Sequence, residues 1–433
     1  MTAANGLAAL VGTGWAEPFT LALMLAGFGA LAVWRRWPIG VALLLSAWVG
    51  AAVNGDWLPA RHLAEGAFSY LDPILVIVTA MIFMRALADG GALVTIVGFV
   101  QRRLGHRPAV LLPMLMGIVM FPGMITGSST ASVLATGTMV GSMLVSLGLS
   151  RERAGAIIAM GGVLGMVAPP INLPAMLIGA GIDLPYAGFA APLAVAAFPL
   201  AIVVVYWLGW PALRARTRDQ GQALAAPMTV WWALVAPLAA AALMAAPRVW
   251  PAVVPDYGLP LTFLVSAGLV VVVSPRFRVI ASLLRATEEV LPVAGILTGV
   301  GAFIQVMTVT GGRGWLVAAM LGAPSWAVFG AAAVSIPLFG AVSAFGSASV
   351  LGVPFLLALL GRNEIVTTSA LSMLAALGDL MLPAALAATL AAQAVGMADR
   401  RRVLRLCVVP ALGVVAVAIL MLAWSPQLGR WLR

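Results

Sequence analysis

Long apolar segments, separated by short clusters of arginine, determine what this chain can fold into. Residues 18–34 and 404–424 are close to the length that spans the roughly 30 Å hydrocarbon layer as a helix, and residues 39–53 form a shorter apolar segment. Hydrophobic residues make up 63% of the 433 residues and charged residues only 9%, whereas soluble domains carry about 25% charged residues. The segments are continuous rather than alternating, so they indicate helices and not the strands of a barrel. The sequence therefore predicts an all-α polytopic membrane protein.

The charges and the rare residue types exclude several functions. The net charge is +10, but every basic residue is an arginine that stands between apolar segments, which is typical of topology signals and not of nucleic-acid binding. Cys407 is the only cysteine, and His62 and His106 are the only histidines, so neither a disulfide nor a Cys/His metal centre is expected. The chain has no phosphate-binding loop and no set of catalytic residues. We therefore expect no enzyme activity and no organic cofactor.

Two polar motifs recur in the same order in the two halves of the chain. GMITGSSTASVL (123–134) matches GAVSAFGSASVL (340–351) at an offset of 217, which pairs Gly123 with Gly340 and Thr126 with Ser343. LGMVAPP (164–170) matches LGDLMLP (377–383) at an offset of 213. Both LGMVAPP and LGDLMLP end in proline, which breaks a helix at that point in each half.

These motifs predict the organisation of the chain. Apolar arms on both sides of each Gly/Ser/Thr motif are short for a full crossing, so each pair is predicted to form a re-entrant hairpin. Arginines flank the first hairpin much more than the second, which indicates inverted repeats with two discontinuous helices. The predicted parts are N-terminal scaffold helices (1–60), repeat 1 (61–212, hairpin 109–147, broken helix 152–182), a linker with scaffold helices (213–278), and repeat 2 (279–433, hairpin 325–360, broken helix 364–397).

Hydroxyl groups and freed backbone groups at membrane depth point to a binding site. Irregular backbone is tolerated there only inside protein or beside a wet cavity, where it offers carbonyls to cations and N–H groups to anions. The predicted substrate-binding residues are Thr126, Ser128, Ser129, Asn172, Ser343 and Ser349. Small residues also serve close helix packing, and Asn172 is equally suited to cap a helix. Asp379 is the one acid inside a broken helix, which indicates either an ion or proton site or a capping role.

FPGMITGSSTASVLATGTMV (121–140) and RAGAIIAMGGVLGMVAPPINLPAMLIGAGI (153–182) resemble the large membrane subunit of tripartite ATP-independent periplasmic (TRAP) transporters, within the ion transporter superfamily. The resemblance implies an elevator-type carrier of the bacterial cytoplasmic (inner) membrane that takes up small organic acids with sodium. It also implies two partners, a small four-helix membrane subunit and an extracytoplasmic substrate-binding protein. The sodium ligands it implies are Ser128, Thr130, Gly165, Ala168 and Pro169 at the first site, and Ser343, Ser347, Gly378 and Pro383 at the second. Asp379 departs from the family pattern at the second site and is predicted there as an additional ligand.

Three functional hypotheses follow. The first is a sodium-coupled importer of a small organic anion such as a carboxylate, acting as the permease subunit of a TRAP-type system. The second is a stand-alone, proton-coupled organic-anion carrier that uses Asp379, because the second break has LMLPAALA where a Pro-Pro pair is usual for the family. The third is a channel or a membrane scaffold that transports nothing.

Overall fold

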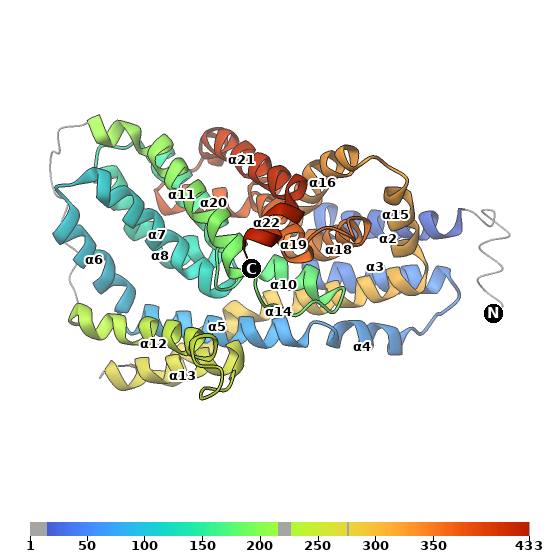
Figure 1. The fold of residues 1–433 in the computed structure, drawn as a ribbon, viewed down its shortest axis with the longest axis horizontal. Helices are drawn as coiled ribbons and strands as arrows, with labels where there is room; N and C mark the ends of the chain where they lie inside the picture. The colour runs from blue at the N-terminus through green and yellow to red at the C-terminus, as the bar shows by residue number, and fades with distance from the viewer. Residues whose placement is uncertain (1–14, 215–226, 275–276, 433) are drawn as a thin grey trace.

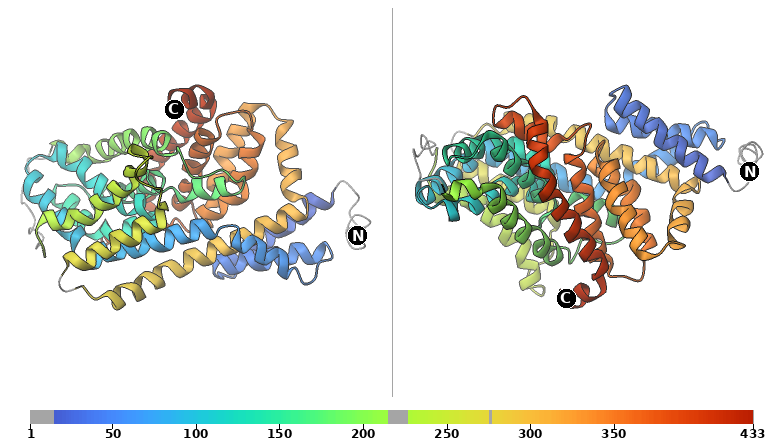
Figure 2. Two further views of the ribbon diagram at one scale, coloured as in Figure 1. Left: turned by 60° about the horizontal axis from the view of Figure 1, so that its bottom comes forward. Right: turned by 90° about the horizontal axis from the view of Figure 1, so that it is seen from above.

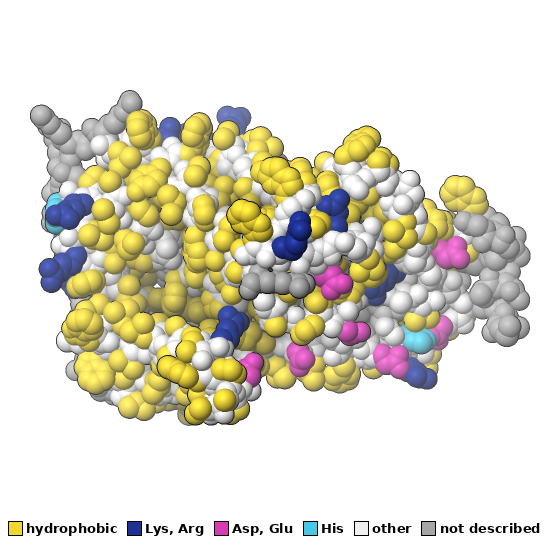
Figure 3. All heavy atoms as spheres, in the orientation of Figure 1, with side chains coloured by type: hydrophobic (Ala, Val, Ile, Leu, Met, Phe, Trp, Pro, Cys, Tyr) yellow, Lys and Arg dark blue, Asp and Glu magenta, His cyan; other side chains and the backbone are white. Residues whose placement is uncertain are grey.

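A computed structural model describes residues 15–214, 227–274 and 277–432, and within these ranges every regular element is a helix (Figure 1). Seven of the described helices are long and apolar enough to cross a membrane. Apolar side chains cover most of the face in Figure 3, and acidic side chains gather toward the end where helix α4 (Ala60–Phe68) lies. The all-α class predicted from the sequence is confirmed. The predicted linker RARTRDQGQ (214–222) lies almost wholly outside the described residues.

Two helical pairs stand outside the repeats, near opposite ends of the molecule (Figures 1 and 2). The first pair is α2 and α3, and α3 packs along α14; the second is α12 and α13, which pack against α6 and α5 respectively. The predicted segment 39–53 coincides with α3. The bounds are Ala16–Gly29 for α2, followed by a π-helical segment Ala30–Trp34, Ile39–Val53 for α3, Val230–Val249 for α12 and Gly258–Val273 for α13.

A long antiparallel contact joins the two halves along the lower edge of Figure 1. On one side lie α4 (Ala60–Phe68) and α5 (Leu71–Asp89), and on the other lies α14 (Val279–Val309). At one end Gln305 donates a hydrogen bond to Glu65, at 3.3 Å. At the other end Arg85 pairs with Glu289, at 2.9 Å. Side chains from both halves therefore close both ends of this contact.

The first repeat continues from α5 into a surface helix, a hairpin and a broken helix. Gly91, with φ +78°, starts the surface helix, and Gly311, with φ +80°, starts its counterpart in the second repeat. Both glycines adopt the left-handed backbone that other residues avoid. The helices are α6 (Ala92–Leu104), the hairpin α7 (Pro108–Thr126) and α8 (Ser129–Ser146), the broken helix α9 (Arg151–Val167) and α10 (Leu173–Ala180), and α11 (Ala190–Arg214).

The second repeat has the same order of elements with a more irregular hairpin. Its returning arm includes a π-helical segment, and its broken helix includes a 3₁₀ turn before the gap. The elements are α15 (Gly312–Leu321), the hairpin α16 (Ser325–Gly340), α17 (Ala344–Ser347), the π-helical segment Ala348–Gly352 and α18 (Val353–Ala358), then α19 (Glu364–Ala376), the 3₁₀ turn Leu377–Leu380, α20 (Leu386–Ala394), α21 (Arg400–Ala423) and α22 (Ser425–Trp431).

The structure corrects one argument made from the sequence. The first arm was expected to end near residue 121, but α7 continues through the start of the motif to Thr126, because nothing before Gly127 stops the helix. At 19 residues α7 is long enough to cross a membrane by itself. Its length therefore does not support a re-entrant hairpin, and re-entry stays a prediction.

Candidate functional site

The tip of the first hairpin is a two-residue turn with a serine cap. Gly127 ends α7 with φ +62°, and Ser128 then caps α8 by accepting a hydrogen bond from the Ala131 N–H at 3.3 Å. The Ser128 hydroxyl also lies 2.8 Å from the Thr130 hydroxyl. Two oxygens of the predicted first sodium site are therefore neighbours at the tip.

This tip packs directly on the break between α9 and α10. A β-carbon at Gly123 would lie 2.9 Å from the carbonyl carbon of Gly165, closer than two such atoms can approach. The backbone N–H of Ile171, inside the break, donates a hydrogen bond to the Met124 carbonyl at 3.0 Å. Because glycine stands on both sides of this contact, in α7 and in α9, the hairpin can approach the predicted carbonyl ligands of the first break.

The second tip packs on the second break in the same way. A β-carbon at Gly340 would lie 2.8 Å from the Cα of Gly378. Ser343 caps α17 by accepting a hydrogen bond from the Gly346 N–H at 3.1 Å. The bonds Pro169–Pro170 and Leu382–Pro383 are both cis.

The pairing of Thr126 with Ser343, inferred from the sequence, is wrong in structural terms. Thr126 is the last residue of α7, and its hydroxyl donates to the Pro122 carbonyl at 2.8 Å. The counterpart of Ser343 is Ser128, because both residues cap the returning arm. The cap lies three residues before the ASVL sequence in the first repeat and five residues before it in the second. The returning arm of the second repeat also contains the wider, π-helical turns of Ala348–Gly352.

Side chains also connect the two repeats across the centre of the molecule, where α10 packs against α19. The Ser129 hydroxyl, at the start of α8, donates a hydrogen bond to the Asp379 carboxylate in the second break. Asn172 donates one to the Ser372 hydroxyl of α19 at 2.8 Å. The two tips and the two breaks are thus one connected group.

Asn172 also caps α10. Its side-chain oxygen accepts the Ala175 N–H at 2.9 Å, and its side-chain nitrogen donates to the Val167 carbonyl at 3.1 Å. The capping role that the sequence left open for Asn172 is confirmed, while a substrate-binding role stays a prediction.

The predicted site residues differ in exposure. The buried ones are Thr126, Ser128, Ser129, Gly165, Ala168, Asn172, Ser343, Ser347, Ser349 and Gly378, the partly buried ones are Thr130, Pro169 and Asp379, and Pro383 is exposed. Most of the predicted substrate-binding hydroxyls therefore face protein in this conformation.

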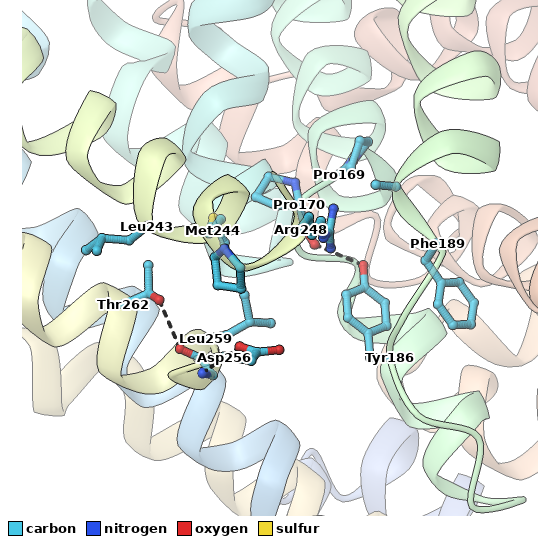
Figure 4. A pocket seen from close by; sticks show the side chains of 13 residues that line it. Pro169, Pro170, Tyr186, Phe189, Leu243, Met244, Arg248, Asp256, Leu259 and Thr262 are labelled. Atoms are coloured by element: carbon cyan, nitrogen blue, oxygen red, sulfur yellow. Dashed lines mark hydrogen bonds between the residues drawn. The ribbon is translucent and has the colours of Figure 1, made fainter. Parts of the chain in front are cut away.

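A cavity of about 300 Å³ lies beside the first break (Figure 4). Pro169 and Pro170 form one wall, and the ends of α12 and α13 form the other. The Tyr186 hydroxyl donates to the Pro170 carbonyl at 3.1 Å and accepts the Asn172 N–H at 2.8 Å, which fixes the broken backbone beside the cavity. Cavities of this volume are within the range that binds small molecules.

Arg248 contributes a cation to this cavity that the sequence did not reveal. It ends α12 and lies beside Pro170 and Tyr186 in Figure 4. Within the described residues it forms no ion pair. Asp256 lines the same cavity, and one of its oxygens accepts the Gly258 N–H at 2.9 Å. In the sequence Arg248 is only a single arginine after an apolar segment, which is typical of a membrane interface.

The arrangement of duplicated tips and breaks has a known counterpart. A family model described as the DctM component of the tripartite ATP-independent periplasmic transporter matches residues 22–428. The chain belongs to this TRAP family. It is therefore a permease component of a TRAP-type secondary transporter and a multi-pass protein of the bacterial inner membrane, as the resemblance implied.

One curated relative and two solved structures are similar to this chain. The isethionate TRAP transporter permease protein DctMQ of Oleidesulfovibrio alaskensis is 29% identical over 228 residues, which cover 50% of this chain and 35% of that protein. The YdaH transporter of Alcanivorax borkumensis is 16% identical with a TM-score of 0.61, over 86% of this chain and 89% of that one. MtrF of Neisseria gonorrhoeae, from a class of antimetabolite efflux pumps, is 12% identical with a TM-score of 0.60, over 90% and 93%. These two structures bear on the fold alone.

Proposed function

We propose that this TRAP permease imports a small organic anion, such as a carboxylate or a sulfonate, coupled to sodium. The observation that carries the proposal is the cavity at the first break, where Arg248 is a cation without an ion pair among the described residues. A guanidinium binds carboxylates and sulfonates in the same two-pronged geometry. Arg248 lies beside the broken backbone at Pro169 and Pro170, so an anion bound to it would contact both the break and the scaffold helix α12.

The test of substrate binding is uptake into proteoliposomes that contain the permease with its small subunit and binding protein. Radiolabelled succinate and isethionate are the probes. Arg248→Gln should raise the apparent KM by about 10–100-fold, since a charged hydrogen bond contributes about 1.5–3 kcal/mol. Arg248→Lys should be intermediate, because a lysine presents only a point charge.

Arg430→Gln is the matched control for this test. Arg430 is also an exposed arginine near the end of a helix, α22, and it lies outside the cavity. Its KM should be unchanged. If Arg248→Gln behaves like Arg430→Gln with both probes, the cavity is not the substrate site.

The sodium sites are proposed at the two places where tip and break meet. At the first, Ser128 and Thr130 supply hydroxyls that are 2.8 Å apart, and Gly165, Ala168 and Pro169 supply carbonyls. At the second, Ser343 and Ser347 face a break whose backbone touches Gly340. Ser128→Leu should abolish sodium-driven uptake while the protein still folds. Near-normal uptake would mean that the first tip only packs.

Proton coupling through Asp379 is the second candidate, and the hydrogen bond from Ser129 favours it. The bond connects a titratable carboxylate to the tip of the other repeat. If this carboxylate carries the proton, Asp379→Asn should abolish pH-driven uptake and leave passive exchange. An unchanged ion dependence in Asp379→Asn would remove the residue from coupling.

The partners proposed for this chain are those of a tripartite system, a small four-helix membrane subunit and an extracytoplasmic substrate-binding protein. Uptake that requires both added proteins supports this assignment. Uptake by the permease alone supports the stand-alone carrier instead. The absence of saturable, gradient-driven accumulation of either probe would indicate a channel or a scaffold.

A further inference from the structure

A groove of about 820 Å³ runs between α11 and α21, away from the tips and breaks. Several of its apolar residues are strongly exposed: Val203 by 63%, Trp207 by 60% and Val409 by 54%. In a protein of the membrane such a groove faces lipid or another chain. Its residues take no part in the proposed substrate and ion sites.

The groove has two cations at one end and no acid. Arg153, in the first turn of α9, donates to the Leu208 carbonyl of α11 at 3.0 Å. Arg405, in the second turn of α21, is exposed and forms no ion pair within the described residues. None of the residues that line the groove is acidic. The end of the groove therefore carries about two uncompensated positive charges.

The polarity changes along the groove in the way that it changes across half a bilayer. Trp207, Trp210 and Tyr206 lie with the arginines, and these are the side chains that concentrate at the headgroup level of a membrane. Val409 lies one helical turn beyond Arg405, and Ile202 and Val203 precede the tryptophans on α11, so the other end of the groove is aliphatic.

We propose that this groove binds one anionic phospholipid. The phosphate pairs with Arg405 and Arg153, the aromatic rings surround the glycerol region, and an acyl chain lies along Val203 and Val409. Basic pockets between membrane helices bind anionic headgroups by this combination of charge and apolar contact. A free phosphate would use the arginines alone, and a wholly apolar transmembrane helix of a partner would leave both charges without a counterion.

The bound lipid connects elements that belong to both repeats. Arg153 starts the broken helix α9, α11 ends the first repeat, and α21 follows the second break. The occupied groove therefore ties the start of α9 in one repeat to the start of α21 in the other.

Native mass spectrometry of the full-length protein released from detergent micelles tests this proposal. With micelles that contain phosphatidylglycerol, we expect one retained lipid per protein, and with phosphatidylcholine we expect none. Arg405→Gln should weaken retention about fivefold, the effect of one basic residue near an anionic surface. Arg430→Gln is the control and should retain lipid as the unchanged protein does. Arg153→Gln would also lose a hydrogen bond to α11, so it is not a clean test of lipid binding. Trp207→Leu is therefore the second test variant. It keeps an apolar side chain but removes the aromatic ring that is proposed to contact the glycerol region, so it should also weaken retention.

Three outcomes would overturn the proposal. Equal retention by Arg405→Gln and Arg430→Gln would show that the lipid binds elsewhere. Equal retention of phosphatidylcholine and phosphatidylglycerol would remove the role of charge. If Arg405→Gln loses capture of the small subunit but retains lipid, the groove is a protein interface.

Discussion

Adding one methyl group where each hairpin tip meets its break is the sharpest test of the site geometry. In Gly340→Ala the new carbon would lie 2.8 Å from the Cα of Gly378, and 3.3 Å from the Ala375 carbonyl oxygen. Backbone atoms on the facing helix cannot move aside as a flexible side chain does. Overpacking of this kind costs about 1–3 kcal/mol.

The same helix offers a matched control. Gly330 is also in α16, but a β-carbon there would have no atom within 4 Å. Gly330→Ala should therefore stabilise the protein by about 0.5–1 kcal/mol, because alanine is the better helix residue. The free energies of unfolding of the two variants should differ by about 1.5–4 kcal/mol. In the first repeat, α7 offers the same comparison between Gly123 and Gly117, whose β-carbon would also meet open space.

The assay uses the single thiol of the chain. Cys407 is 1% exposed in the folded protein, so a fluorogenic maleimide reacts with it only as the protein opens. The temperature at which Cys407 reacts should be lower for Gly340→Ala than for the unchanged protein, and slightly higher for Gly330→Ala. The same order should hold for Gly123→Ala and Gly117→Ala. If Gly340→Ala and Gly330→Ala melt together, the second tip does not touch its break, and the proposed ion sites lose their basis.

Two further substitutions test contacts that hold the site and the long helical contact. Asn172→Ala should lower the free energy of unfolding by more than the roughly 0.5–2 kcal/mol of a helix cap, because the Ser372 hydroxyl and the Val167 carbonyl each lose the hydrogen bond that the Asn172 amide donates. Asn363→Ala, which removes the cap of α19 and a close contact with Gly429 of α22, is the comparison in the Cys407 assay. The hydrogen bond from Arg61 lowers the pKa of Glu65, so the stability it supplies is present above the pKa of an unpaired glutamate and is lost as the pH falls through the lowered value. Unfolding temperatures of the unchanged protein and of Glu65→Gln should differ at pH 7 and converge in acid.

The positions of most helices could be predicted from the sequence, because a membrane helix requires an apolar segment of a certain length. Residues 39–53 and the breaks at Pro169 and Pro383 follow from that length and from proline chemistry. The end of α7 was not predictable in the same way, since Gly123 is tolerated inside a helix when a neighbouring backbone needs its space. Only Gly127, with its left-handed φ, ends the helix.

The contacts that define the site depend on distances that no local pattern encodes. Ser129 and Asp379 are 250 residues apart in the chain, and Arg248 belongs to a scaffold helix that the motifs do not include. The cavity exists only because α12 and α13 fold against the first break. A single arginine after an apolar segment looks the same in the sequence whether it faces lipid headgroups or a cavity.

The two repeats share the glycine contact between tip and break but differ in their side-chain chemistry. Each tip meets its break through glycine, so the symmetric part of the site is the backbone itself. The side chains break this symmetry: the first break faces Arg248, while the second carries Asp379 and satisfies it with Ser129 of the other repeat. A carboxylate inside a membrane is costly without a partner, so a proton or cation bound at Asp379, as proposed above, would compete with the Ser129 hydroxyl for the same oxygen. If Asp379 takes part in coupling, loss of this bond would weaken one of the contacts between the first tip and the second break.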